Sequence, residues 1–346
     1  MEINSLIRGN IKQLKPYASA RDEFSFNQDD SILLDANENP FETTVNRYPD
    51  PYQLELKKVI SKRKSVPIHN MVLGNGSDEL IDLILTAFVE PNTDEVILLP
   101  PTYGMYKVRA QILGAKLVEV PLKPDFQIDV EGILTKTSEN SKVLFICSPN
   151  NPSGNLIAAT DVEILLKRFP GIVVIDEAYI DFSKQASFWR KSKDYENLII
   201  LQTFSKAFGM AGLRLGMAFA SSKIVNVLNK IKAPYNINSL TQSYAIKSLV
   251  DSENILKKEV NDLLFQRKLL VEELTELKMV LKIYDSETNF LLVKVDDAFK
   301  RYNQLKENGI IVRNRSNLMH CNQCLRISIG TEVENKKLVT VLKSKE

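Results

Sequence analysis

Four short runs of apolar residues recur in the first two thirds of the chain. They cover residues 96–99, 143–147, 172–175 and 198–201, and each is almost entirely aliphatic or aromatic. Runs of this kind are typical of strands that are buried on both faces, as in a parallel sheet covered by helices. We therefore predict central strands at these four positions.

Helical periodicity separates the predicted strands. Apolar side chains between Leu80 and Phe88 share one helical face, and those between Val162 and Phe169 share another. Ser77 and Asp161 precede these faces, where short polar side chains can cap a helix. Strand and helix thus alternate, which predicts an α/β fold with a doubly wound, mainly parallel sheet.

The pattern changes after about residue 250. Leucines and other residues spaced by three and four from Leu256 to Leu277 predict one long amphipathic helix. Strands over 290–293 and 325–329, with a helix over 298–308 closed by Gly309, predict a smaller α+β unit.

The beginning of the chain has little periodicity. It contains Pro16 and Pro40, and we interpret it as an arm that lies over other parts of the molecule. We therefore predict an N-terminal arm over residues 1–45, a large domain over 46–250 and a small C-terminal domain over 251–346.

Composition and charge exclude several classes of protein. The 346 residues are 44% hydrophobic and 25% charged, which is typical of a globular protein. Lys and Arg number 45 against 43 Asp and Glu, with no block of like charge, so we do not expect a nucleic-acid partner. No apolar run approaches the ~18 residues of a membrane helix, and the start lacks a signal-peptide layout. Three cysteines fit a reducing compartment, and we expect a cytoplasmic protein.

Ligands of open α/β sheets bind beyond the carboxyl ends of the strands, so polar segments there are the first candidates for a site. The segment 74–78 has two glycines before a predicted helix and could hold a phosphate on backbone N–H groups. A flexible turn with a serine cap explains it equally well. The segment 148–154 holds two prolines, a glycine and Asn151, and is either a plain turn or a loop that aims an amide into a cleft.

Two further candidates carry charge. Asp176 follows a buried strand and needs a cation or several donors, so a structural ion pair is the plainest explanation of that carboxylate. Lys206 stands among apolar and small residues in the segment 203–214. If these neighbours desolvate it, the pKa of its amine falls toward that of a usable nucleophile. The alternative is that Lys206 is an ordinary, solvated surface lysine.

The candidates follow one another along the chain as a phosphate cup, an asparagine, a carboxylate with a following tyrosine, and a lysine with a nearby arginine. This series resembles the fold-type I family of pyridoxal-phosphate aminotransferases. The resemblance covers almost the whole chain. Further matching segments narrow it to members that act on histidinol phosphate. They are Leu14-Lys15-Pro16-Tyr17, Asp35-Ala36-Asn37-Glu38-Asn39-Pro40, Arg47-Tyr48-Pro49, Pro100-Pro101-Thr102-Tyr103-Gly104-Met105-Tyr106, Ser286-Glu287-Thr288-Asn289-Phe290, Gly309-Ile310-Ile311-Val312-Arg313 and Cys324-Leu325-Arg326-Ile327.

The resemblance implies how pyridoxal 5′-phosphate would be used. Lys206 would form the internal Schiff base and then shuttle a proton between the substrate Cα and the cofactor. Asp176 would pair with the pyridine nitrogen and keep it protonated. Asn151 and Tyr179 would bind the ring's 3-oxygen, and Tyr103 would stack on the ring.

The resemblance also implies how the cofactor's phosphate is held. The backbone of Gly76, Ser77 and Asp78 would bind it, and Ser205 and Arg214 would add charge-assisted bonds. Tyr48 would reach the phosphate from a second subunit, which makes a homodimer the functional unit.

Substrate contacts follow from the same resemblance, which implies exchange of an amino group between histidinol phosphate and glutamate or its keto acid, 2-oxoglutarate, in histidine biosynthesis. Arg326 would bind the substrate anion nearest the reacting carbon, and Arg313 the distal group or the phosphate. The N-terminal arm would contribute to the small domain and the active site. Within it, Tyr17 would pack on the imidazole, and Asn37 would line the same pocket.

Three other functions remain open. An aminotransferase of the same fold could act on aromatic amino acids, and a decarboxylase of the same fold on a phosphorylated amino acid. A non-catalytic cofactor-binding protein is a third alternative. The segment from His320 to Cys324 looks like half a zinc site, but it lacks a second pair of ligands, and we expect no metal.

Overall fold

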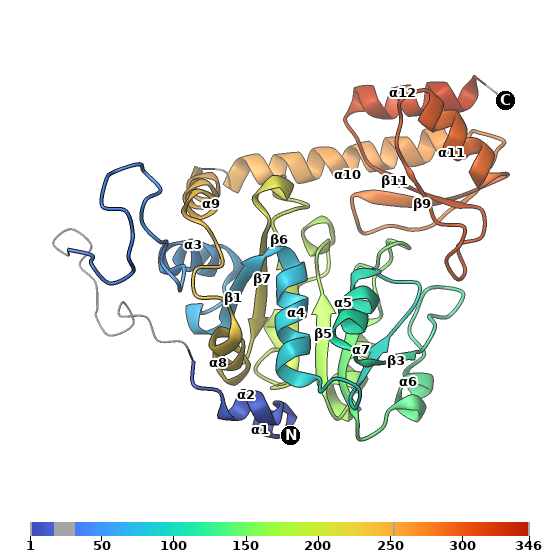
Figure 1. Ribbon diagram of the computed structural model, residues 1–346. Helices are drawn as coiled ribbons and strands as arrows, with labels where there is room; N and C mark the ends of the chain where they lie inside the picture. The colour runs from blue at the N-terminus through green and yellow to red at the C-terminus, as the bar shows by residue number, and fades with distance from the viewer. Residues whose placement is uncertain (1, 17–31, 252, 345–346) are drawn as a thin grey trace.

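The computed structural model describes residues 2–16, 32–251 and 253–344. It contains a seven-stranded sheet and a four-stranded sheet, and the long helix α10 (Glu253–Thr275) runs from the first unit to the second (Figure 1). The seven-stranded sheet has the order β1-β7-β6-β5-β4-β2-β3, and the other has the order β10-β11-β9-β8. The strands of the larger sheet are β1 (Met71–Asn75), β2 (Glu95–Leu98), β3 (Lys116–Glu119), β4 (Ser141–Cys147), β5 (Ile172–Asp176), β6 (Leu198–Thr203) and β7 (Leu215–Ala220).

The direction of these strands confirms the predicted mainly parallel sheet. Strands β3, β2, β4, β5 and β6 pair in parallel, and only β7 runs antiparallel to its neighbours β6 and β1. All four predicted strands are present. In this register Cys147 of β4 lies opposite Asp176 of β5, so the two strands end together at one edge of the sheet.

Helices cover both faces of the sheet because its central strands are apolar on both sides. In β5, Val173 and Ile175 belong to one hydrophobic core, and Ile172 and Val174 belong to the other. Figure 1 shows α4 lying across one of these faces. The helices of this unit are α3 (Leu54–Lys64), α4 (Gly76–Phe88), α5 (Met105–Leu113), α6 (Val130–Lys136), α7 (Ala159–Arg168), α8 (Ser222–Ile231) and α9 (Ser239–Asp251), with short 3-10 turns η2 (Ile68–Asn70), η3 (Ile180–Phe182), η4 (Phe188–Lys191) and η5 (Ala211–Leu213).

Two helix starts differ from the sequence prediction. Helix α4 begins at Gly76, and Ser77 is inside its first turn rather than its cap. Helix α7 begins at Ala159, so Asp161 also lies in the first turn, where its charge favours the helix dipole. Neither helix has a side-chain cap. The first residue of α4, Gly76, has a φ of +73°, which only glycine adopts readily.

The four-stranded unit has its own core, which includes Leu270 and Leu274 from the second half of α10. Its sheet is antiparallel throughout. The predicted strands near 290 and 325 and the helix near 298 are present. The elements are β8 (Val280–Ile283), β9 (Phe290–Val295), α11 (Ala298–Glu307), β10 (Arg313–Asn314), β11 (Cys324–Ser328) and α12 (Glu332–Lys343).

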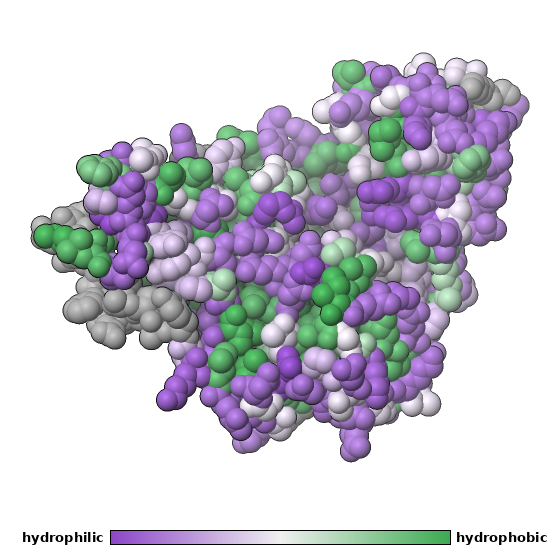
Figure 2. All heavy atoms as spheres, viewed as in Figure 1, coloured by the Kyte–Doolittle hydropathy of each residue, from purple (hydrophilic) through white to green (hydrophobic). Residues whose placement is uncertain are grey.

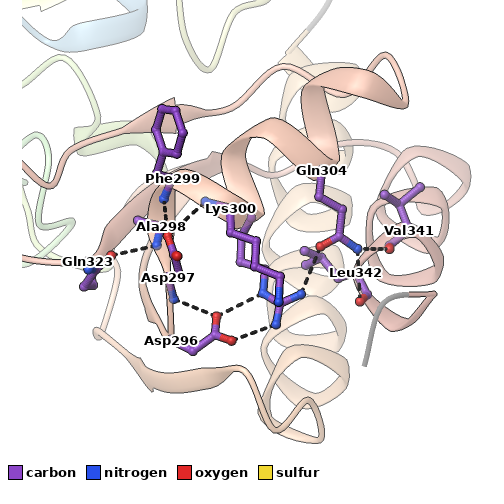
Figure 3. A network of polar contacts seen from close by, with 10 residues as sticks. Asp296, Asp297, Ala298, Phe299, Lys300, Gln304, Gln323, Val341 and Leu342 are labelled. Carbon is purple, nitrogen blue, oxygen red and sulfur yellow. Dashed lines mark hydrogen bonds and ion pairs between the residues drawn. The ribbon is translucent and has the colours of Figure 1, made fainter.

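Figure 3 shows a polar network that ties this unit together. Asp297 caps α11 by accepting the N–H groups of Phe299 and Lys300, at 3.0 and 2.9 Å. The buried guanidinium of Arg301 donates to both carboxylate oxygens of Asp296, at 2.9 and 2.7 Å. Beyond it, Gln304 donates to the Val341 carbonyl of α12 at 2.6 Å, so α11 holds both the sheet and the last helix.

The beginning of the chain packs on the seven-stranded unit. Helices α1 (Ile3–Leu6) and α2 (Gly9–Gln13) bury apolar side chains against its core, and Arg8 pairs with Glu90 at 3.0 Å. Residues 32–50, before α3, loop away from the body (Figure 1), and hydrophobic side chains are exposed on that part of the surface (Figure 2). Among the described residues, no helix is long and apolar enough to cross a membrane.

Candidate active site

A cavity of about 500 Å³ lies at the carboxyl ends of the parallel strands. It is bounded by the start of α4, the loop after β2, the ends of β4, β5 and β6, and the strands β10 and β11 of the four-stranded unit. Most of the predicted site residues line it. These are Ser77, Asp78, Tyr103, Asn151, Asp176, Tyr179, Ser205, Lys206, Arg214, Arg313 and Arg326.

Four predicted residues are not among those that line this cavity. Gly76 lies directly beside it, because a Cβ atom at this position would stand 2.6 Å from Nη2 of Arg214. Asn37 and Tyr48 line a second cavity, in which Tyr48 stacks on Tyr235 with the ring centroids 4.4 Å apart. Tyr17 lies outside the described residues.

Asp176 is a buried carboxylate held by two neutral donors. Its side chain is only 3% exposed; Oδ1 accepts the N–H of Ala178 at 3.0 Å, and Oδ2 accepts the hydroxyl of Tyr106 at 2.5 Å. Burial raises the pKa of Asp176, while the bond from Tyr106 opposes that rise. The carboxylate therefore lacks a hydrogen-bonded cation among the described residues, and a ligand with a charged N–H group would supply one.

Lys206 faces the same space. Burial lowers the pKa of its amine, and the positive charge of Arg326 lowers it further, whereas Asp176 opposes both. The Nζ atom lies 5.7 Å from the centre of the Tyr179 ring. The lysine therefore has the desolvated setting that its sequence neighbours predicted, and a larger neutral fraction than a surface lysine.

Asn151, Tyr179 and Arg326 form a chain of polar contacts along the cavity. Arg326 donates to Oδ1 of Asn151, and the Asn151 amide donates to the Tyr179 hydroxyl at 3.5 Å. Burial raises the pKa of Tyr179, so the phenol stays protonated and can donate. Arg326 also lies over the Phe290 ring, 5.2 Å from its centroid, which fixes the guanidinium at this end of the site.

The start of α4 forms the opposite end of the cavity. Here Arg214 pairs with Asp78 at 3.6 Å, and the Tyr103 hydroxyl donates to Asp78 at 3.2 Å. A Cβ at Gly216 of β7 would stand 2.5 Å from the Ser77 nitrogen, so strand and helix start approach closely only because this residue is glycine. A helix N-terminus beside an arginine and Ser205 is a suitable site for a phosphate group.

Two residues of the site were missed by the sequence analysis. Tyr106 belongs to the segment 100–106, three residues after Tyr103, but no role was predicted for it. The signal was the buried carboxylate of Asp176, which needs a hydrogen-bond donor such as the Tyr106 hydroxyl. Arg315 lines the cavity with Arg313 and Arg326. Its spacing of two from Arg313 in an extended segment was the available signal, since alternate residues of a strand share a face.

The class of protein follows from comparison of the whole chain with known families. Residues 23–342 match the family Aminotransferase class I and II, and the chain belongs to this family. Within it, the chain groups with the histidinol-phosphate aminotransferases. The histidinol-phosphate aminotransferase of Flavobacterium psychrophilum is 53% identical over 342 residues, which are 99% of this chain and 98% of the relative.

Solved structures agree with this assignment. The histidinol-phosphate aminotransferase from Clostridium acetobutylicum superposes with a TM-score of 0.80 at 27% identity, covering 87% of this chain and 91% of that one. The enzyme from Sinorhizobium meliloti, solved in complex with pyridoxal-5′-phosphate, has a TM-score of 0.80 at 25% identity, covering 88% of this chain and 84% of that one.

Proposed function

We propose that this chain transfers an amino group between histidinol phosphate and 2-oxoglutarate, with bound pyridoxal 5′-phosphate, as a step of histidine biosynthesis. The observation that carries the proposal is one cavity that combines a desolvated lysine, a buried carboxylate and several arginines. The three free, buried cysteines fit a reducing compartment, and we place the reaction in the cytoplasm.

The residues of the cavity fit the cofactor. Asp176 has neutral donors on both oxygens, so a protonated pyridine nitrogen would provide the missing cation. Asn151 and Tyr179 offer hydrogen-bond donors for the ring's 3-oxygen, and Tyr103 offers an aromatic face. The start of α4, Ser205 and Arg214 would bind the phosphate.

The bound cofactor supplies a carbonyl that amines condense with and a ring that accepts the electron pair left at the substrate's Cα. The chain supplies the rest. Burial lowers the pKa of Lys206, so its neutral amine can take the proton from Cα, and the ammonium formed in this way can return that proton. Asp176 holds a proton at the pyridine nitrogen, and the contact between Arg326 and Asn151 orients the substrate anion near the ring.

Both substrates are anions, and the cavity wall is cationic. Glutamate brings two carboxylates, whereas histidinol phosphate brings a phosphate and a neutral imidazole. A guanidinium fork binds carboxylate and phosphate alike, so Arg326 and Arg313 can serve both molecules in turn.

A half-reaction tests this function. The cofactor-loaded protein is mixed with histidinol phosphate alone, or with phenylalanine alone, and the absorbance of the bound cofactor is followed. We expect rapid bleaching by histidinol phosphate and return of the colour on adding 2-oxoglutarate. Bleaching by phenylalanine only would move the substrate to the aromatic class, release of carbon dioxide would indicate a decarboxylase, and failure to bind the cofactor would overturn the proposal.

We also propose that the enzyme is a homodimer in which the segment before α3 reaches the partner's cavity. In the single chain this segment exposes Ile32, Leu34 and Phe41 by 86%, 85% and 77%, and such side chains are usually covered. Tyr48 is half exposed and lines a different cavity from Lys206. In the dimer, Tyr48 would contact the cofactor phosphate of the partner, while Tyr17 and Asn37 keep their predicted places in the substrate pocket.

Mixed dimers distinguish this arrangement from action within one chain. Lys206→Ala and Tyr48→Ala proteins are each expected to have little activity, and sedimentation should give twice the chain mass of 39.2 kDa. Refolding the two together should restore activity, because half of the mixed-dimer sites then combine an intact Lys206 with an intact Tyr48. No recovery in mixtures shown to exchange subunits would refute the crossing.

A further inference from the structure

The four-stranded unit brings a third guanidinium to the cavity wall, and neither the motifs nor the proposed contacts use it. Arg315 directly follows β10, and its backbone N–H donates to the Cys324 carbonyl of β11 at 2.8 Å. Its side chain is half-buried and lines the same cavity as Arg313 and Arg326. Within the described ranges, the Nε atom of Arg315 is buried and has no hydrogen-bond partner.

No carboxylate of the described residues compensates the charge of Arg315. Burial lowers the pKa of its guanidinium, and the positive charges of Arg326 and then Arg313 lower it further. The two aspartates that line the cavity are engaged elsewhere, Asp78 with Tyr103 and Arg214, and Asp176 with Tyr106. A desolvated cation among like charges is costly unless an anion joins it.

The three arginines are not equivalent. Arg326 is fixed by Asn151 and by the Phe290 ring, so it is committed to the end of the cavity near Tyr179. Arg313 is exposed at the rim. Arg315 is half-buried, as Arg326 is, but its buried Nε still has a hydrogen bond to donate.

The number of acceptor atoms suggests which anion uses this donor. A carboxylate carries one charge on two oxygens and is satisfied by a single guanidinium fork. A phosphoester carries about −1.5 to −2 charges at neutral pH and three acceptor oxygens. It can therefore bind two guanidinium groups at once, and it gains more from a third cation than a carboxylate does.

We propose that Arg315 is a specificity-determining residue that binds the phosphate of a phosphoester substrate and contributes little to binding of dicarboxylates. This inference rests on the proposed function and refines it, because it assigns the choice of phosphorylated over carboxylate substrates to one side chain. Arg326 serves both substrates, whereas Arg315 is needed for only one of them.

The test compares Arg315→Gln with wild type on both substrates. We expect kcat/KM for histidinol phosphate to fall about 10- to 100-fold, the range for loss of a charge-assisted bond, and kcat/KM for glutamate to fall less than about threefold. Arg315→Lys keeps the charge without the fork and should lose an intermediate amount. The exposed Arg168→Gln is the matched control and should change neither value.

A binding measurement accompanies the kinetics. Calorimetric titration of the cofactor-loaded proteins with inorganic phosphate should show at least about tenfold weaker binding in Arg315→Gln than in wild type. Equal losses for both substrates, or unchanged phosphate binding, would overturn the role of Arg315. If wild type itself does not react with histidinol phosphate, the proposed function fails, and the titration still decides whether Arg315 binds phosphate.

Discussion

Replacing Tyr106 by Phe removes one hydroxyl from the most buried part of the site. The Tyr106 ring is fully buried, stacks on Phe145 at 4.7 Å and meets the edge of Tyr103 at 5.4 Å. Phenylalanine preserves these ring contacts. The change therefore isolates the bond that the Tyr106 hydroxyl donates to Asp176.

The size of the effect follows from the nature of that bond. Hydrogen bonds to charged groups contribute about 1.5–3 kcal/mol, so loss of this bond raises the pKa of Asp176 further. Burial already raises this pKa in the folded protein above its unfolded value. An aspartate in the unfolded chain has a pKa of about 4. Above that pH, ionisation of Asp176 lowers the free energy of unfolding, and the bond from Tyr106 offsets part of this loss.

The sign of the pH dependence is thus fixed. At acidic pH, Asp176 is protonated in both proteins, and Tyr106→Phe should destabilise the cofactor-free protein only slightly. As pH rises through the folded pKa of Asp176, the loss should grow to about 1.5–3 kcal/mol.

Urea unfolding of the cofactor-free proteins at a series of pH values measures this difference. Tyr103→Phe is the matched control, because its hydroxyl donates to the less buried Asp78 at 3.2 Å and should cost less than about 1 kcal/mol. Affinity for pyridoxal phosphate should fall in Tyr106→Phe as well. Stability curves of wild type and Tyr106→Phe that stay parallel across the pH range would refute the reasoning, since the hydroxyl would then not be supporting a charge.

Three further outcomes are expected. Lys206→Ala should lower turnover by about 10⁴-fold or more while the protein stays folded, and undiminished turnover in a stopped-flow assay would contradict the covalent role of the lysine. Arg326→Ala should lower kcat/KM at least about tenfold for both substrates and more than Tyr17→Phe does; equal losses in the two variants would reject its role. Asp296→Asn should destabilise the protein by about 1–2 kcal/mol at neutral pH, because it leaves the buried Arg301 without a carboxylate. The loss is smaller than for a fully buried ion pair because Asp296 is partly exposed to solvent. Arg301 lowers the pKa of Asp296, so this difference should disappear as pH falls through that pKa, and a loss independent of pH in chemical denaturation would contradict the ion pair.

The sequence predicted those parts of the fold in which one local pattern has one meaning. The apolar runs at 143–147 and 172–175 are strands β4 and β5 because a strand covered on both faces must be apolar on both sides. The antiparallel direction of β7 was not readable, because strand direction depends on the connection before it and not on side-chain pattern. The capping roles of Ser77 and Asp161 were wrong because the helices begin earlier, at Gly76 and Ala159, and neither has a side-chain cap.

The site could be predicted to a similar extent. Asp176 and Lys206 were found because a charged residue at the end of an apolar run is unusual. Tyr106 was passed over because a tyrosine on a helix is ordinary until its partner is known, and that partner lies 70 residues further along the chain. Asn37 and Tyr48 were assigned by resemblance only, and their roles stay predictions: that of Tyr48 concerns a second subunit, and Asn37 lines a different cavity from Lys206.

The two sheets, each with its own core, bring different groups to the cavity. Asp176 and Lys206 stand on the seven-stranded sheet, while Arg313, Arg315 and Arg326 stand on the four-stranded one, and the two cores share the single helix α10. Substitutions at Arg313 and Arg315 can therefore change which anion is accepted without touching the groups that face the cofactor, whereas Arg326 is hydrogen-bonded to Asn151 and is coupled to them. Such a division gives the molecule modularity: one reaction chemistry can be combined with new substrate ranges by altering a short stretch of a small sheet.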